Sequence, residues 1–128
     1  MKTHTTILTK DIVKLEVGTE FNETTQTISG YFELDIESQS KFVKAINQII
    51  NRGKSKIILD MRYINYIDSS GLWAIFEGHK KALHNSGQLI ILKPSKDVKR
   101  VLDITKMSSK IKVVQTEDAA LAVLSESN

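Results

Sequence analysis

The sequence contains no cysteine, one proline and few aromatic residues, and these shortages exclude several classes of protein. Without cysteine the chain can form no disulfide, thiolate metal site or cysteine nucleophile. The absence of cysteine agrees with a reducing compartment. No apolar run approaches the roughly 20 residues of a membrane span, and residues 1–17 lack the continuous apolar core of a signal peptide. We therefore expect a cytoplasmic protein with no membrane span.

Basic residues are scattered along the chain rather than gathered in one stretch. The 18 lysines and arginines oppose 15 acidic residues, which leaves a formal net charge of +3. The densest basic groups, at 80–81, 96–100 and 110–112, each lie close to acidic or apolar residues. Nucleic-acid-binding surfaces usually combine a basic stripe with interleaved aromatic residues, whereas aromatic residues make up 6% of this chain. We therefore expect no direct contact with nucleic acid.

The common signatures of enzymes are missing. The chain has no phosphate-binding Gly-x-x-x-x-Gly-Lys-Ser/Thr loop, no Gly-x-Gly-x-x-Gly and no Gly-x-Ser-x-Gly. His79 and His84 are five residues apart, which is not the spacing of a helical metal site, and we interpret His79 as a packed core residue. Asp60 and Asp68 could form a carboxylate pair, but nothing nearby resembles an acid, base or oxyanion device. We predict no catalysis, cofactor or metal.

The first third of the chain has the alternating pattern of β-strands. Residues 12–17 alternate between apolar and polar side chains, as a strand with one buried face does. A second strand is predicted through residues 27–32, after a polar turn at 22–24. Two such strands with a short link predict an antiparallel hairpin at a sheet edge. Residues 1–10 form either an N-terminal extension or an extra edge strand.

The rest of the chain alternates between helical spacing and short, continuous apolar runs. Such runs suit central strands covered on both faces, and their alternation with helices indicates a sheet with a parallel centre. We therefore predict one α/β domain over residues 1–128 with a core at about 12–124, a mixed sheet with an antiparallel edge hairpin and about four helices. Helices are expected at 37–51, at 69–85, from 94 and from 116, and strands at 56–60, 88–92 and 111–114.

The segment Tyr66-Ile67-Asp68-Ser69-Ser70-Gly71-Leu72, at the start of the second predicted helix, is the most informative part of the sequence. The carboxylate of Asp68 can accept hydrogen bonds from unpaired amides of the first turn. Ser69 and Ser70 place their hydroxyls in the positive field of the helix N-terminus. Gly71 leaves room for another backbone or side chain to approach. Capping alone would also explain Asp-Ser-Ser before an apolar helix.

The helical spacing of this segment indicates which side chains face outward. At about 100° per residue, Ser70 lies opposite the apolar stripe and Ser69 at its margin, so Ser70 is expected to be the accessible serine. Trp73 lies outside the stripe and either packs under the strand-to-helix loop or is an exposed binding anchor. The stripe consists of Leu72, Ile75, Phe76, His79 and Leu83. The expected contact face consists of Asp68, Ser69, Ser70, Gly71, Trp73, Ala74, Glu77 and Lys81.

Together with the segments at 57–60, 89–92 and 98–102, this motif resembles a STAS domain. Within that family the sequence is most similar to bacterial anti-sigma-factor antagonists. The resemblance runs from about residue 12 to residue 124, and Asp-Ser-Ser-Gly-Leu is its most specific marker. Trp73 departs from the pattern, because these antagonists usually have a small residue at that position.

The resemblance implies a phosphorylation switch. The unphosphorylated antagonist binds an anti-sigma factor that is also a serine kinase, and a sigma factor is freed. The kinase then phosphorylates the second serine of the motif, here Ser70 with Ser69 as the alternative, and binding is abolished. A metal-dependent, PP2C-type serine phosphatase resets the antagonist, which is itself no enzyme and acts as a monomer or weak dimer.

Two other interpretations keep the fold but change the function. The chain could be a non-switching STAS scaffold or interaction subunit of a larger signalling or transport complex. It could also be a small-ligand binder or enzyme that uses a pocket near Asp60, Asp68 and Pro94.

Overall fold

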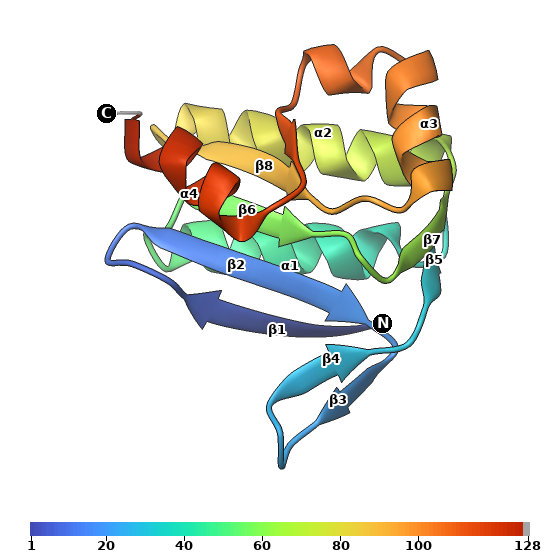
Figure 1. Ribbon diagram of the computed structural model, residues 1–128, viewed down its shortest axis with the longest axis horizontal. Coiled ribbons are helices and arrows are strands. Elements are labelled where there is room, and N and C mark those ends of the chain that lie inside the picture. Colours follow the sequence, from blue (N-terminus) through green and yellow to red (C-terminus); the bar gives the residue numbers. More distant parts are fainter. Residues whose placement is uncertain (127–128) are drawn as a thin grey trace.

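The computed structural model describes residues 1–126 and contains a five-stranded mixed sheet (Figure 1). Residues 127–128, which the predicted domain includes, lie outside the described part. The strands are β1 (Lys2–Ile7), β2 (Ile12–Gly18), β3 (Glu20–Asn22), β4 (Thr27–Ser29), β5 (Phe32–Leu34), β6 (Lys56–Asp60), β7 (Ile64–Ile67), β8 (Gln88–Leu92) and β9 (Val113–Val114). The helices are α1 (Gln39–Asn51), α2 (Ser69–His84), α3 (Lys96–Ile104) and α4 (Glu117–Glu126), and η1 (Met107–Ser109) is a 3-10 turn.

The main sheet has the strand order β1-β2-β6-β8-β9. β1 is antiparallel to β2, whereas β2, β6, β8 and β9 are parallel to one another. These pairings and the four α-helices of the described residues confirm the predicted mixed α/β fold with an antiparallel edge and a parallel centre. None of the helices within residues 1–126 combines the length and apolar character needed to cross a membrane.

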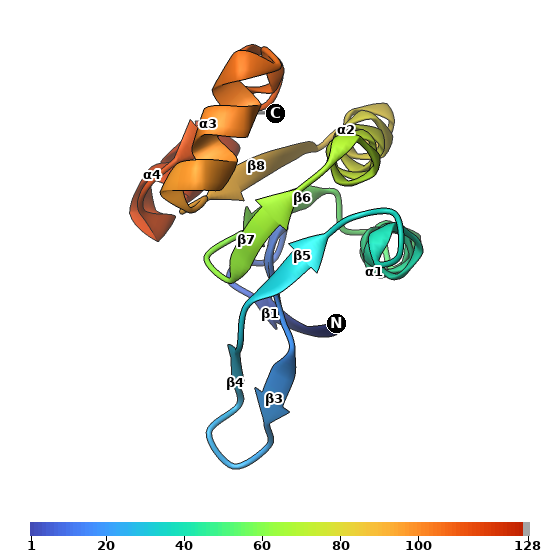
Figure 2. The same ribbon diagram turned by 90° about the vertical axis from the view of Figure 1, so that its right-hand side faces the viewer.

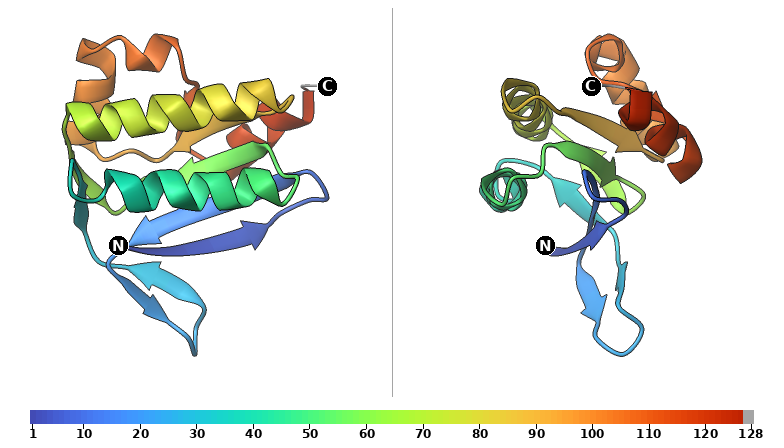
Figure 3. Two further views of the ribbon diagram at one scale, coloured as in Figure 1. Left: turned by 180° about the vertical axis from the view of Figure 1, so that it is seen from behind. Right: turned by 90° about the vertical axis from the view of Figure 1, so that its left-hand side faces the viewer.

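Helices cover both faces of the sheet. α1 and α2 lie side by side on one face and α4 lies on the other (Figure 3). Successive side chains of a strand point to opposite faces, so Ile57 and Leu59 of β6 join the larger core under α1 and α2, and Ile58 joins the smaller core under α4. All three are fully buried. Burial on both faces explains why β6 is a continuous apolar run.

The antiparallel partner of β2 is β1, and the partner predicted at 27–32 is wrong. β1 pairs with residues 13–18 over its whole length, so the N-terminal residues form the extra edge strand. β3 and β4 form a separate hairpin that projects from the main sheet (Figure 1). A local pattern of alternation predicts strands and a turn, but it does not specify which distant strand completes the sheet.

A second small sheet positions the start of α2. β5 and β7 are parallel, with Leu34 opposite Ile67, and they lead directly into the segments that begin α1 and α2 (Figure 2). The Asp68 N–H donates to the Leu34 carbonyl oxygen at 3.3 Å. Neither three- to four-residue strand was predicted, although together they fix where the serine motif lies.

The buried face of α2 is rotated from the predicted apolar stripe. Leu83 is 52% exposed and Phe76 is half-buried, although both belong to that stripe. Gly78 faces α1 instead, where an added Cβ would lie 3.4 Å from Ile46 Cγ2. Small side chains let the two helices approach, which a stripe drawn through large apolar residues overlooks. The buried residues of α2 are Gly71, Leu72, Ala74, Ile75, Gly78, His79 and Ala82.

Replacing Gly71 with alanine should destabilise the fold by about 1–3 kcal/mol, as overpacking typically does. The added Cβ would collide with the Leu34 carbonyl oxygen. Urea denaturation of Gly71→Ala checks this loss. Gly78→Ala is the matched control, because its Cβ fits at ordinary contact distance and alanine is favoured over glycine by about 1 kcal/mol within helices. An unchanged free energy of unfolding for Gly71→Ala would contradict the close packing.

Candidate functional site

Asp68 caps α2 in the way that the sequence predicts. Its backbone is extended, and its Oδ1 accepts a hydrogen bond from the Gly71 N–H at 2.9 Å. Its carbonyl oxygen accepts from the Leu72 N–H at 3.0 Å. Asp68 therefore stands between the end of β7 and the start of α2, and its carboxylate caps the helix. The N–H groups of the two serines between them remain at the positive end of the helix.

Both serines are accessible, but in the opposite order to the prediction. Ser69 is exposed and Ser70 is half-buried. The rotation of the buried face toward Ala74 and Gly78 brings Ser70 to its margin and turns Ser69 to solvent. Within residues 1–126 neither hydroxyl has a hydrogen-bond partner. A phosphate on either oxygen would therefore displace no existing side-chain interaction.

The other residues of the expected contact face divide between surface and core. Trp73 is 53% exposed, so the interpretation in which it packs under the strand-to-helix loop is wrong. Ala74 has no exposed surface and cannot supply a side chain to the face, because it faces the core beside α1. Gly71 is also buried, and it acts by letting the backbone of Leu34 approach.

Glu77 and Lys81 are half-buried and have partners within the chain. The Lys81 ammonium donates to Asn47 Oδ1 of α1 at 2.8 Å, which ties the two helices together. Glu77 pairs with Lys80 at 2.8 Å on the outer side of α2. The charged groups of Glu77 and Lys81 thus already interact with other residues of the chain.

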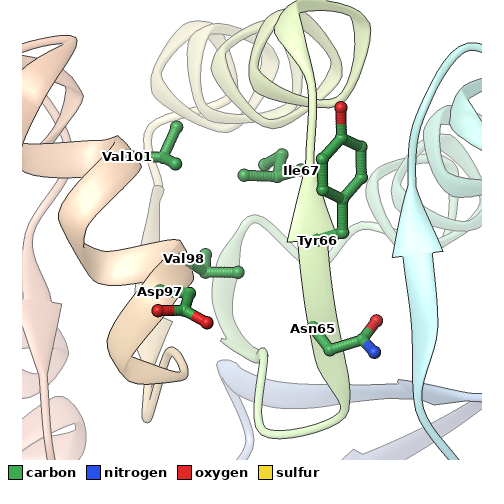
Figure 4. A pocket seen from close by; sticks show the side chains of 6 residues that line it. All are labelled: Asn65, Tyr66, Ile67, Asp97, Val98 and Val101. Carbon is green, nitrogen blue, oxygen red and sulfur yellow. The ribbon is translucent and has the colours of Figure 1, made fainter.

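Two exposed apolar side chains near the start of α2 were not predicted. Ile36 is 67% exposed just after β5, and Tyr66 is 50% exposed in β7. The pairing of β5 with β7 brings both segments to the first turn of α2, and the Tyr66 ring points toward the β5 side of β7 (Figure 4). We define the contact face as Ile36, Tyr66, Ser69, Ser70 and Trp73. The sequence did offer a sign of this exposed residue: Ile36 stands between two acidic residues and outside every predicted strand and helix.

The loop that carries Ile36 is well ordered by hydrogen bonds. Asp35 Oδ1 accepts from the Glu37 N–H at 3.0 Å and from the Ser38 N–H at 3.2 Å. The Ser38 hydroxyl donates to the Glu33 carbonyl oxygen at 2.8 Å. The exposed isoleucine is therefore presented by a fixed turn, as a preformed binding surface requires.

The two aspartates of the alternative carboxylate site have separate partners. Asp60 is buried and accepts from the Arg62 guanidinium at 3.3 Å and from the Arg62 N–H at 3.0 Å. Asp68 is occupied as the cap of α2. No group of three or more histidine or acidic residues within residues 1–126 is arranged to hold a metal ion.

His79 is a packed core residue, as the sequence indicates. It is 6% exposed, and its Nδ1 accepts a hydrogen bond from the Leu89 N–H at 3.3 Å. Burial lowers the pKa of its imidazole, because the charged form would lose its hydration. The histidine thus joins α2 to β8 in its neutral form.

The STAS domain family model matches residues 22–120, which is more than half of the chain. The chain belongs to the STAS domain family. A Thermotoga neapolitana protein named as a candidate anti-sigma factor antagonist homologue is 32% identical over 90 residues, covering 70% of this chain and 80% of that protein. A Thermotoga maritima protein named as a candidate anti-sigma factor antagonist is 30% identical, with the same coverage.

Solved structures share the fold of this STAS domain. The crystal structure of a Thermotoga maritima protein described as a candidate anti-sigma factor antagonist has a TM-score of 0.78 at 24% identity, covering 97% of this chain and 95% of that one. The anti-sigma factor antagonist SpoIIAA in its unphosphorylated form has a TM-score of 0.66 at 18% identity, covering 98% and 99%. The phosphorylated form of SpoIIAA, the Bacillus cell fate determinant, has a TM-score of 0.64 at 19% identity, covering 95% and 99%.

The burial of His79 predicts that acid destabilises this STAS domain. Because the folded-state pKa is lowered from its usual value of about 6.5, the unfolded chain binds a proton more readily, and stability falls as pH drops below that value. The His79→Gln variant should lose less free energy of unfolding between about pH 7.5 and about pH 5 than the wild type. Urea denaturation at the two pH values measures this difference.

His84→Gln is the matched control, because His84 is exposed on the same helix. It should keep the pH dependence of the wild type. A pH dependence in His79→Gln as steep as that of the wild type would contradict the assignment.

Proposed function

We propose that this STAS domain is an anti-sigma-factor antagonist switched by phosphorylation of Ser70. In this proposal the unphosphorylated form binds an anti-sigma factor that is also a serine kinase, in the bacterial cytoplasm, and so frees a sigma factor. A PP2C-type phosphatase resets it. The observation that carries the proposal is the start of α2, where two hydroxyls without partners lie among exposed Ile36, Tyr66 and Trp73. The relatives named as candidate antagonists support the same assignment.

The position of the serines suits a switch that changes binding without unfolding the domain. Phosphorylation adds about −1.5 to −2 charge and three acceptor oxygens. At a helix N-terminus, unpaired amides and the helix dipole accommodate that charge. In a docked interface the same phosphate would lose its hydration and meet any facing carboxylate, a cost on the order of several kcal/mol. Phosphorylation therefore favours release over unfolding.

Exposure and motif position favour different serines. Ser69 is the more exposed hydroxyl, and a kinase would reach it without rearrangement. Ser70 is the second serine of the motif, which the resemblance to anti-sigma-factor antagonists assigns as the modified one. We assign the switch to Ser70 and retain Ser69 as the alternative.

Incubation with the cognate kinase and labelled ATP should phosphorylate the chain at Ser70. Label should be lost in Ser70→Ala and kept in Ser69→Ala, because the proposal assigns the phosphate to the Ser70 hydroxyl. Mass spectrometry of the labelled peptide measures the site directly. The reverse pattern would move the switch to Ser69. If the kinase bound both variants tightly but labelled no residue of the wild type, the non-switching scaffold would replace this proposal.

Trp73→Ala should weaken kinase binding by about tenfold or more, because exposed tryptophans often dominate interface energies. Its free energy of unfolding should change by less than about 1 kcal/mol, as exposed residues usually allow. Calorimetric titration and urea denaturation measure the two effects. Leu83→Ala is the matched control, since Leu83 is 52% exposed at the other end of α2. Equal affinities for the two variants would remove Trp73 from the contact face.

A further inference from the structure

The net positive charge of the chain is concentrated in one segment of the fold. Residues 96–110, which form α3 and η1, contain five of the 18 basic residues and two of the 15 acidic ones. Their net charge of +3 equals that of the whole protein, so the remaining residues are balanced. In Figure 1 this segment lies at the upper right of the molecule, and Figure 2 shows α3 beside β7, the strand that leads into α2. We call the basic residues of this segment the basic surface: Lys96, Lys99, Arg100, Lys106 and Lys110.

Most of this charge is available to a partner. Lys99 forms an ion pair with Asp103 at 3.0 Å, and this hydrogen bond lowers the pKa of the Asp103 carboxyl. Lys96, Arg100 and Lys106 are exposed and have no acidic partner among residues 1–126. Three cations therefore face solvent without internal compensation.

The basic surface continues onto α2. The ammonium groups of Lys110 and Lys80 lie 5.4 Å and 5.3 Å from the centre of the same Phe76 ring. Cations over an aromatic face are attracted to its π electrons, so Phe76 holds both side chains together. Lys80 is also paired with Glu77 at 2.8 Å, so Lys110 supplies the positive charge that extends the basic surface to the outer side of α2.

Apolar features lie within this charged region. Ile104 is 71% exposed, beside a shallow depression that Lys96, Lys99 and Arg100 also line. Between α3 and β7 lies a small cleft of about 80 Å³ (Figure 4). Its apolar lining comes from Ile67, Val98 and Val101, and Asn65, Tyr66 and Asp97 complete it.

We propose that the basic surface and this cleft dock an acidic protein segment that carries an apolar side chain. The apolar side chain would enter the cleft, while acidic residues pair with Lys96, Arg100 and Lys106. The cleft is lined by Ile67, two residues before Ser69, so the docking site adjoins the contact face. The identity of the partner as the anti-sigma factor rests on the proposed function, but the chemistry of the docked segment does not.

A protein segment fits these observations better than a membrane or a nucleic acid. Asp97 and Asp103 lie on the same helix, where a layer of lipid phosphates would press against both carboxylates. The small cleft with its mostly apolar lining suits an apolar side chain rather than a charged headgroup. A nucleic-acid-binding surface usually carries a basic stripe, whereas Asp97 and Asp103 interrupt the basic residues of α3.

The same geometry supplies a reason for release on phosphorylation. Two residues of extended chain span about 7 Å, which is within the screening length of about 8 Å at physiological salt. A phosphate on Ser69 would therefore lie within this screening length of Ile67, at one wall of the cleft. The added anion would weaken the attraction between the basic surface and an acidic partner.

The test uses the unphosphorylated full chain and a fluorescein-labelled peptide of repeated Glu-Glu-Leu units, with binding followed by fluorescence anisotropy. The double variant Lys96→Glu/Arg100→Glu should bind this peptide about tenfold more weakly or worse, since it reverses the charge that attracts the acidic groups. Lys10→Glu/Lys44→Glu is the matched control: it makes the same change of net charge at exposed positions elsewhere, and affinity should stay within about twofold. Peptides of Glu-Glu-Ser units should bind more weakly, and Lys-Lys-Leu units should not bind.

Three results would overturn the proposal. The first is equal loss of affinity in the two double variants, and the second is equal binding of the leucine and serine peptides. The third is retention on phosphatidylcholine–phosphatidylglycerol vesicles with no peptide binding, which would assign the surface to membranes. Because no kinase is present, this assay is independent of serine labelling. Peptide binding that depends on the basic surface, in a chain that no kinase labels, would keep the docking site and remove the switch.

Discussion

The first turn of α2 packs against the backbone of β5, and the position of every residue in the contact face depends on that contact. The Leu34 carbonyl oxygen accepts a hydrogen bond from the Asp68 N–H and lies where a side chain at position 71 would be. A glycine therefore follows the two serines. Because β5 is paired with β7, this one contact holds Ile36, Tyr66 and the serines in a fixed arrangement.

Fold and function are separated along the two sides of α2. The side facing α1 and the sheet contains Gly78, Ala82 and His79, which pack closely and contribute no surface to a partner. The opposite side contains Ser69 and Trp73, which contribute little to the core. Ser70 is half-buried at the margin between the two sides, and charge added there still lies beside the free amides of the helix start. The molecule can thus change its binding surface without changing its packing.

Much of this fold could be predicted from periodicity, because β6 and β8 are short apolar runs that are buried after their first residue, and α1 to α4 have helical spacing. The pairing of the strands could not be predicted in the same way. β1, rather than residues 27–32, is the antiparallel neighbour of β2, and the pattern of a strand does not identify its neighbour. The cap at Asp68 was predicted, but the order of exposure of Ser69 and Ser70 was not, because Gly78 and Ala82 carry no apolar signal large enough to mark a buried face. The grouping of basic side chains required the fold, since Lys80 and Lys110 meet only at Phe76.

The most direct test of the account compares the phosphorylated and unphosphorylated chains in two measurements on the same samples. Urea denaturation gives the free energy of unfolding, and calorimetric titration gives the affinity for the anti-sigma factor. The account predicts free energies of unfolding that agree within about 1 kcal/mol, together with a loss of affinity of about a hundredfold or more. A phosphorylated chain that still bound its partner, or that lost binding only because it unfolded, would contradict it.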